Sequence, residues 1–358
     1  MTSEPLSQAD AEHLYREQVK RDLPRNFSAH LIHGMLGQTG FRLLNAPTFL
    51  PAFILLLSGG SDLAVGMALS LQALGAAITP LVGANLIEHR QQVLPAGFIA
   101  GISMRLMVLG VALSGFFLPP TYALYAVMVC LGFFGLFAGA QMVIFNVLLA
   151  KVIPVRNRGK LVGLRNFLAG ITTACVAWWG GVYLVGDTPS ADGYAWVFTI
   201  AFIMTSTGLL MLLRVREPRP PTVAPDVSLL RRLSQIPQLL REDPAFTRYF
   251  LARALTTMGR MALPFYILYA GQTIGLTGTT LATLTIAFTL AATVSNLAWG
   301  YLSDRNGFRF SFLLSVALWI GATVGLLISR EFYVVVIIFA GIGAAQEGFR
   351  IASINMTL

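Results

Sequence analysis

Ten apolar stretches, each long enough to cross a lipid bilayer, follow one another along this chain. A chain inside a bilayer has no water to bind its backbone, and segments of this length satisfy their own backbone groups as α-helices. The sequence therefore predicts an all-α integral membrane protein with about ten transmembrane helices. These helices are expected near residues 30–57, 63–87, 93–116, 121–150, 160–184, 194–214, 246–270, 279–302, 310–329 and 332–358.

The composition agrees with a chain surrounded by lipid. Hydrophobic residues make up 56% of the sequence and charged residues 11%, whereas soluble domains carry about 25% charged residues. The net charge is +9, but the basic residues lie between apolar spans, so no nucleic-acid partner is expected. The sequence shows no nucleophile–base pair, metal-ligand spacing or phosphate-binding glycine loop, and therefore predicts neither an enzyme nor a cofactor or metal site.

Charges are distributed unequally between the connections. The N-terminal tail and every second connection carry most of the arginines and lysines. The other connections carry Asp62, Asp187, Asp192 and Glu331 beside a single arginine, Arg330. Basic connections remain in the cytoplasm during membrane insertion. We therefore expect a multi-pass protein with a cytoplasmic N-terminus, as in a bacterial inner (plasma) membrane.

The long polar connection after the sixth span divides the chain into two groups of helices. Within this connection, apolar residues recur at helical spacing among arginines over 229–236, which is typical of an amphipathic helix on the inner leaflet. The predicted parts are a charged cytoplasmic tail (1–29), a first bundle of six helices (30–214), a cytoplasmic linker with this amphipathic helix (215–245) and a second bundle of four helices (246–358).

One short connection carries a specific motif, G-x-L-x-D-R-x-G-x-R. Its residues are Gly300, Leu302, Asp304, Arg305, Gly307 and Arg309. A weaker copy with Glu88 and Arg90 follows the second span, and internal repeats of this kind are typical of secondary transporters. The motif resembles the signature loop of the major facilitator superfamily of membrane transporters.

This resemblance implies two bundles of six helices around a central cavity, which opens alternately to the two sides of the membrane. Spans 1, 4, 7 and 10 would line the cavity. Helices 11 and 12 would then be absent, and we interpret the chain as incomplete at its C-terminal end. A complete ten-helix protein is the alternative interpretation.

Two arginines lie deep within spans that the resemblance places at the cavity. Arg42 lies midway along the first span, five residues before Pro47, and Arg260 lies in the seventh span, four residues before Pro264. The prolines predict irregular helices. Charges at this depth are costly and mark functional sites, so we expect both arginines near the substrate. Burial against backbone carbonyl groups is the alternative.

Glu347 and Arg350 share one face of the tenth span because they are three residues apart. A desolvated Glu347 would suit reversible protonation and hence proton coupling, whereas an ion pair of Glu347 with Arg350 or Arg42 would only hold helices together. The other candidates for hydrogen bonds to a solute, with bonds between helices as the alternative, are Asn45, Gln141 and Gln346.

Three further arginines lie in or near the spans. Arg165 and Arg253 lie close to cytoplasmic ends, where long side chains reach water at little cost, and we expect structural roles for them. Arg105 lies near the middle of the third span and requires a partner that the sequence does not identify.

The signature loop is also a candidate gate, together with its weaker copy. By the pseudo-symmetry of the two halves, Asp304 should face the start of the fifth span near Arg158 and Lys160, where a helix N-terminus favours a carboxylate. This latch would hold the bundles together on the cytoplasmic side while the cavity opens outward. The alternative is that the loop residues only shape the loop and set its topology.

Alternating-access transport of a small solute is the function most consistent with these features. The excess of intramembrane arginine over acidic residues favours an anionic or zwitterionic solute, and proton coupling through Glu347 is a further hypothesis. An exporter of amphipathic drugs or metabolites is the first alternative. A non-transporting membrane receptor or scaffold on the same fold is the second.

Overall fold

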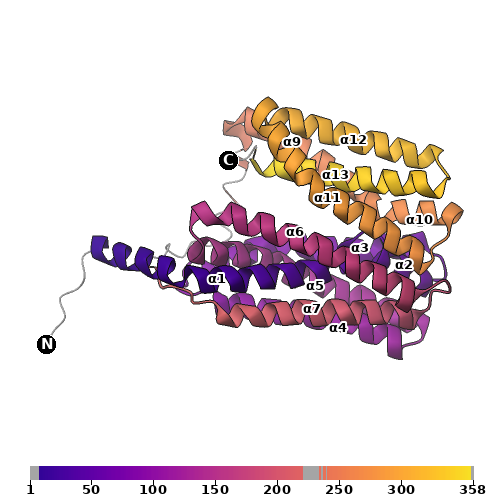
Figure 1. Ribbon diagram of the computed structural model, residues 1–358, viewed down its shortest axis with the longest axis horizontal. Coiled ribbons are helices and arrows are strands. Elements are labelled where there is room, and N and C mark those ends of the chain that lie inside the picture. Colours follow the sequence, from indigo (N-terminus) through magenta and orange to yellow (C-terminus); the bar gives the residue numbers. More distant parts are fainter. Residues whose placement is uncertain (1–7, 221–233, 235–236, 239, 356–358) are drawn as a thin grey trace.

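The computed structural model describes residues 8–220, 234, 237–238 and 240–355, and these form two bundles of helices side by side (Figure 1). The predicted all-α membrane fold is confirmed. The first bundle contains α1 (Gln8–Asn45), α2 (Phe49–Leu57), α3 (Asp62–Ile87), α4 (Leu94–Phe117), α5 (Pro120–Val152), α6 (Val155–Trp179), the π-helix η1 (Gly180–Val185), α7 (Ala191–Met211) and the 3-10 turn η2 (Leu212–Arg214). The second contains α9 (Pro244–Gly259), the 3-10 turn η3 (Arg260–Ala262), α10 (Leu263–Ile274), α11 (Gly278–Asn306), α12 (Phe308–Ile328) and α13 (Phe332–Asn355).

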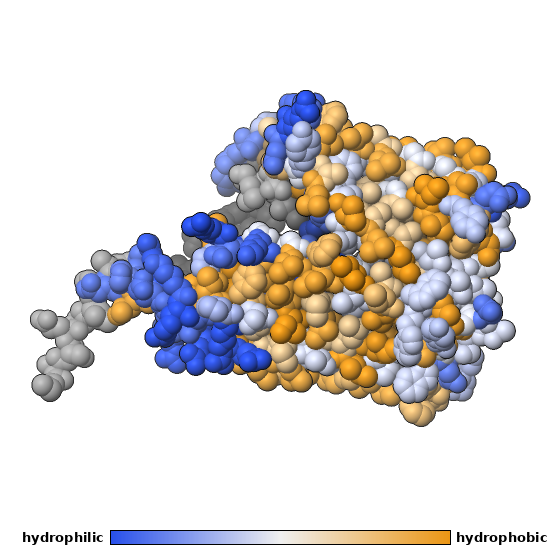
Figure 2. Space-filling model, viewed as in Figure 1, coloured by the Kyte–Doolittle hydropathy of each residue, from blue (hydrophilic) through white to orange (hydrophobic). Residues whose placement is uncertain are grey.

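Most of these helices are long and apolar enough to cross a bilayer. Within the described residues, eight helices meet this criterion alone, and the bent pair α1–α2 makes a ninth. The seventh predicted span, 246–270, is divided into the shorter helices α9 and α10 by η3. Exposed aliphatic and aromatic side chains cover the outside of the spans (Figure 2), because lipid replaces water there.

The two halves repeat the same packing. In the first bundle α5 packs against α3 and α4, and in the second α13 packs against α11 and α12. Small residues permit these contacts: a Cβ on Gly135 of α5 would overlap the backbone oxygen of Gln72 on α3. Close backbone approach of this kind replaces the hydrophobic effect as the source of helix association in lipid. α1 packs against α6 and α7, whereas α9 has no buried residue in the described part of the chain.

α1 runs without a break from Gln8 through the predicted tail into the first span. The boundary expected at residue 29 is therefore not the end of a helix. The buried side chain of Asn26 fixes this part of α1 to the first bundle, because it exchanges two hydrogen bonds, of 3.0 and 2.9 Å, with the backbone of Arg216 after α7. The predicted amphipathic helix of the linker lies almost entirely outside the described residues.

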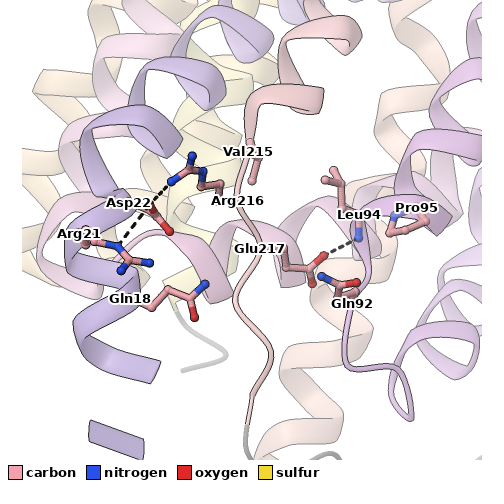
Figure 3. A pocket seen from close by; sticks show the side chains of 9 residues that line it. All are labelled: Gln18, Arg21, Asp22, Gln92, Leu94, Pro95, Val215, Arg216 and Glu217. Carbon is pink, nitrogen blue, oxygen red and sulfur yellow. Dashed lines mark hydrogen bonds and ion pairs between the residues drawn. The ribbon is translucent and has the colours of Figure 1, made fainter. Parts of the chain in front are cut away.

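The first residues of the linker are fixed to the first bundle. Both carboxylate oxygens of Glu217 accept hydrogen bonds from the backbone N–H of Val93, and one also accepts from that of Leu94 at 2.8 Å. Lys151 at the end of α5 pairs with the same carboxylate at 3.2 Å. Glu217 and Leu94 border a pocket of about 400 Å³ between α1, the chain after α7 and the start of α4 (Figure 3). A carboxylate at the start of α4 is favoured by the free N–H groups of the helix.

The bundles meet at one end of the molecule and separate at the other. We call the end with Arg90, Lys151, Arg158 and the signature loop the basic end, and the end with the acidic connections the acidic end. At the acidic end, the N–H of Gly278 on α11 donates to the carbonyl oxygen of Gly186 at 2.7 Å. At the basic end, a hollow separates the bundles (Figure 2).

Candidate functional site

Breaks in two spans place arginines between the bundles. α1 ends at Asn45, α2 begins at Phe49, and the two helices meet at a bend of 41° that contains Pro47. Arg42 lies in the last turn of α1. In the second bundle, η3 begins at Arg260, directly before the helix that contains Pro264. The predicted irregularity of both helices is thus confirmed.

A charged cluster forms where these breaks face α13. The Nε of Arg350 donates to Oε2 of Glu347 at 2.8 Å, and the Nη2 of Arg350 lies 2.6 Å from the same oxygen. Both side chains lie within electrostatic reach of Arg42 and Arg260. Arg165 of α6 is within reach of Arg42 and Arg350. The cluster therefore contains four arginines and one glutamate, which leaves an excess of three positive charges.

The cluster is open to solvent although it lies along spanning helices. The side chain of Arg350 is 47% exposed and that of Glu347 19%, and Asn45 at the end of α1 is exposed. Because Glu347 and Arg350 interact with arginines of the other bundle, their exposed surface faces the space between the bundles rather than lipid.

Neutral polar groups complete the lining. The amide of Asn45 accepts a hydrogen bond from Gln72 at 2.7 Å and donates one to the carbonyl oxygen of Phe41 at 2.8 Å. Nη1 of Arg42 and Nε2 of Gln346 are buried without a hydrogen-bond partner in the described part of the chain. Buried donors without a protein partner are costly, and a hydrogen bond to a solute would satisfy them.

Two residues that sequence analysis considered lie elsewhere. Gln141 is buried inside the first bundle, with its amide against Gly101 of α4, so the structure separates it from the cluster. Arg105 is held by carbonyl groups: its Nε donates to Thr205 and its Nη1 to Gly101, both at 2.7 Å. Its guanidinium also lies 5.3 Å from the centre of the Phe41 ring. These contacts supply the partner that the sequence does not identify.

The signature loop turns the chain from α11 to α12 in one residue. Gly307 has a φ of +84°, a conformation that favours glycine, and Ser303 donates to Ser311 at 2.9 Å across the turn. Asp304, Arg305 and Arg309 are exposed. Gly300 faces open space. The weaker copy is a turn after α3, where Glu88 caps the helix and the N–H of Arg90 donates to Ile87.

The latch predicted for Asp304 is not formed in this conformation. Arg158 at the start of α6 donates instead to the carbonyl oxygens of Ile153 at 2.9 Å and Ala150 at 2.7 Å. Among the described residues, Asp304 makes no ion pair within 4.0 Å. A latch that closes the basic end would be open in a conformation with a hollow there, so the hypothesis stays a prediction.

Comparison with known proteins identifies the family. The model of the Major Facilitator Superfamily matches residues 34–258, which is more than half of the chain. The chain belongs to the major facilitator superfamily. This superfamily consists of secondary transporters rather than enzymes, and its members are multi-pass membrane proteins.

Solved structures of superfamily transporters share the fold. A variant of the nucleoside transporter NupG superimposes with a TM-score of 0.70 at 12% identity, over 90% of this chain and 81% of that one. The D-xylose–proton symporter gives 0.64 at 14% identity, over 92% and 81%. An inward-facing bacterial homologue of the human lysosomal transporter Spinster gives 0.63 at 14% identity, over 96% and 75%.

The chain matches only a short part of one curated relative. The MFS-type transporter ucsD of an Acremonium species is 31% identical over 97 residues, which are 26% of this chain and 16% of that protein.

One member of the cluster, Arg165, was not among the site residues predicted from the sequence. Its position along α6 indicated only a side chain near the end of a span. The structure instead places it against α1 and α5, within reach of Arg42. The signal that was available is Gly34, a glycine inside α1 that leaves space for this side chain.

Proposed function

We propose that this superfamily member is a secondary transporter that moves a small anionic solute between the two bundles by alternating access. The observation that carries the proposal is the excess of three positive charges in the open central cluster. Isolated charges within a membrane are expensive. A solute that supplies the missing negative charge recovers part of this cost, which a neutral solute cannot do.

The arrangement of the bundles supports an inward-open state. The cleft opens at the basic end, and the distribution of arginine and lysine favours a cytoplasmic position for that end. Contacts at the acidic end, including the hydrogen bond of 2.7 Å between Thr48 and Thr285, would close the opposite side. Rocking of one bundle against the other would break these contacts and form new ones at the basic end.

Uptake into liposomes tests the proposal. The purified chain would be reconstituted and supplied with radiolabelled phosphate, succinate or lactate, and with uncharged xylose and uridine as comparison. We expect at least one anion to accumulate and the neutral solutes to remain outside. Arg42→Ala should lower this uptake about tenfold or more, because a charge-assisted hydrogen bond contributes roughly 1.5–3 kcal/mol.

Arg156→Ala is the matched control, because Arg156 is an exposed arginine at the basic end, away from the cluster. Uptake of xylose or uridine alone would contradict the proposal. Binding of an anion without flux would support the receptor, and movement of amphipathic dyes without any anion would support the exporter.

A further inference from the structure

Three helices hold the side chain of Arg165 in a fixed place. α1 carries Gly34 opposite Arg165, and a Cβ at this position would overlap Cδ and Cγ of the arginine. On the other side, the Cζ of Arg165 lies 5.6 Å from the centre of the Phe145 ring of α5. The missing side chain at Gly34 therefore opens a slot in which the arginine lies along α1, and the ring sets the position of its guanidinium.

The slot provides no negative charge for this guanidinium. Nε of Arg165 is buried without a hydrogen-bond partner, and no ion pair of Arg165 is found among the residues that the structure describes. Its electrostatic neighbours at the cleft, Arg42 and Arg350, are positive as well. A buried cation without an acceptor is unfavourable. A purely structural position would be filled at lower cost by an uncharged side chain.

The charges of the cluster are divided between the bundles. Glu347 neutralises Arg350 through their direct ion pair. Arg42 and Arg165 then remain unbalanced on the first bundle and Arg260 on the second. A monovalent anion would leave two of these three charges without a partner. An anion with two negative charges can meet arginines of both bundles at once.

We propose that Arg165 binds the solute directly and that the solute is a divalent anion, either a dicarboxylate or a phosphate group. This inference rests on the proposed function as an anion transporter. Arg42 and Arg165 bind one part of the anion on the first bundle, and Arg260 binds the other part on the second. Gly34 acts as a positioning residue because it gives the Arg165 side chain its space.

Binding measurements on the purified full chain test this assignment. Isothermal titration would compare succinate with butyrate, which has the same number of carbons and one carboxylate fewer. Phosphate at pH 8, where it is divalent, would distinguish the phosphate source from the dicarboxylate source. We expect one divalent anion to bind the wild-type protein about tenfold or more tightly than butyrate, since the second carboxylate adds charge-assisted hydrogen bonds.

Two variants test the role of Arg165. Arg165→Gln should reduce the ratio of divalent to monovalent affinity about tenfold. Gly34→Ala keeps every charge but displaces the arginine, and it should reduce the same ratio in part. Gly37→Ala is the matched control on the same helix, because a Cβ there meets no atom within 4 Å. The affinity ratio does not depend on the fraction of protein that is folded, so lower stability of a variant does not imitate the result.

Different outcomes would overturn the role of Arg165 and the proposed function as an anion transporter. If Arg165→Gln and Gly34→Ala leave the ratio unchanged, Arg165 does not bind the solute and the inference is overturned. Equal affinity for succinate, phosphate and butyrate in the wild-type protein overturns the divalent assignment. If none of these anions binds or is transported, the proposed function itself fails, and not only the role of Arg165.

Discussion

Among the described residues, Glu347 is the one acidic residue in the cluster of four arginines. Its ion pair with Arg350 agrees with the interpretation in which it holds charges in place. Proton coupling requires that this pair opens during the cycle and that the carboxylate then accepts a proton. The ion-pair role and the proton-carrier role predict different effects of removing the negative charge of Glu347.

Replacement of the carboxylate by an amide distinguishes them. If Glu347 carries protons, Glu347→Gln should abolish accumulation driven by a pH gradient, while exchange of labelled for unlabelled solute continues. Exchange requires alternating access but no net proton movement. Uptake into liposomes with and without a pH gradient measures both rates. Equal loss of the two rates would assign Glu347 to the ion pair alone.

The partner of Arg105 could not be predicted from the sequence. Its depth in the third span indicated correctly that it needs a partner. The partners are the carbonyl oxygens of Thr205 and Gly101, and every residue has such an oxygen. Sequence therefore cannot distinguish an arginine held by the backbone from one that faces a cavity.

Two helix breaks were predictable from the sequence. Pro47 and Pro264 indicated where the first and seventh spans lose their regular backbone, because proline removes a hydrogen bond and clashes with the preceding turn. Helix rotation was less predictable. In lipid the outer face of a span is as apolar as its core, so the sequence did not indicate that Gln141 points into the first bundle or that Arg165 points towards Arg42.

At the acidic end, a contact between two glycines joins the elements η1 and α11. A Cβ on Gly181 or Gly278 would overlap the carbonyl oxygen of the other residue. Backbone atoms cannot move aside as a side chain can, and such overpacking costs about 1–3 kcal/mol. Gly278→Ala should therefore disfavour the conformation that is closed at this end.

Cysteine accessibility measures this shift. Asn45→Cys, in a chain whose Cys130 and Cys175 are replaced, reports the cleft because Asn45 is exposed there. Gly278→Ala should slow alkylation from the basic end about fivefold or more, which corresponds to roughly 1 kcal/mol. Gly321→Ala on α12, where a Cβ meets no atom within 4 Å, should leave the rate unchanged. An unchanged rate in Gly278→Ala would show that the contact does not limit closure.

At the scale of the whole molecule, the two ends should act as opposing gates. The acidic end is closed by backbone contacts in this structure, and the latch of Asp304 is expected to close the basic end in the other state. Asp304→Asn removes a charge that forms no ion pair with any described residue in the present conformation, so it should destabilise only the other state.

The same cysteine reporter tests this expectation. Alkylation of Asn45→Cys from the basic end should become about two- to fivefold faster in Asp304→Asn, because a carboxylate near a helix N-terminus contributes roughly 0.3–1 kcal/mol. Asp187→Asn, an exposed change at the acidic end, is the control. A rate equal to that of the control would leave the signature loop with a role in loop shape and topology only.

The long α1 also offers a way to observe the transport cycle from outside. Its 38 residues span about 57 Å, at about 1.5 Å per residue, and Asn26 ties its outer part to the chain that leaves α7. When the first bundle tilts, the N-terminal end of this helix therefore moves farther than the part of the helix inside the bundle. A fluorophore on the exposed Leu14 would report each turnover optically, with every residue of the binding cluster left intact.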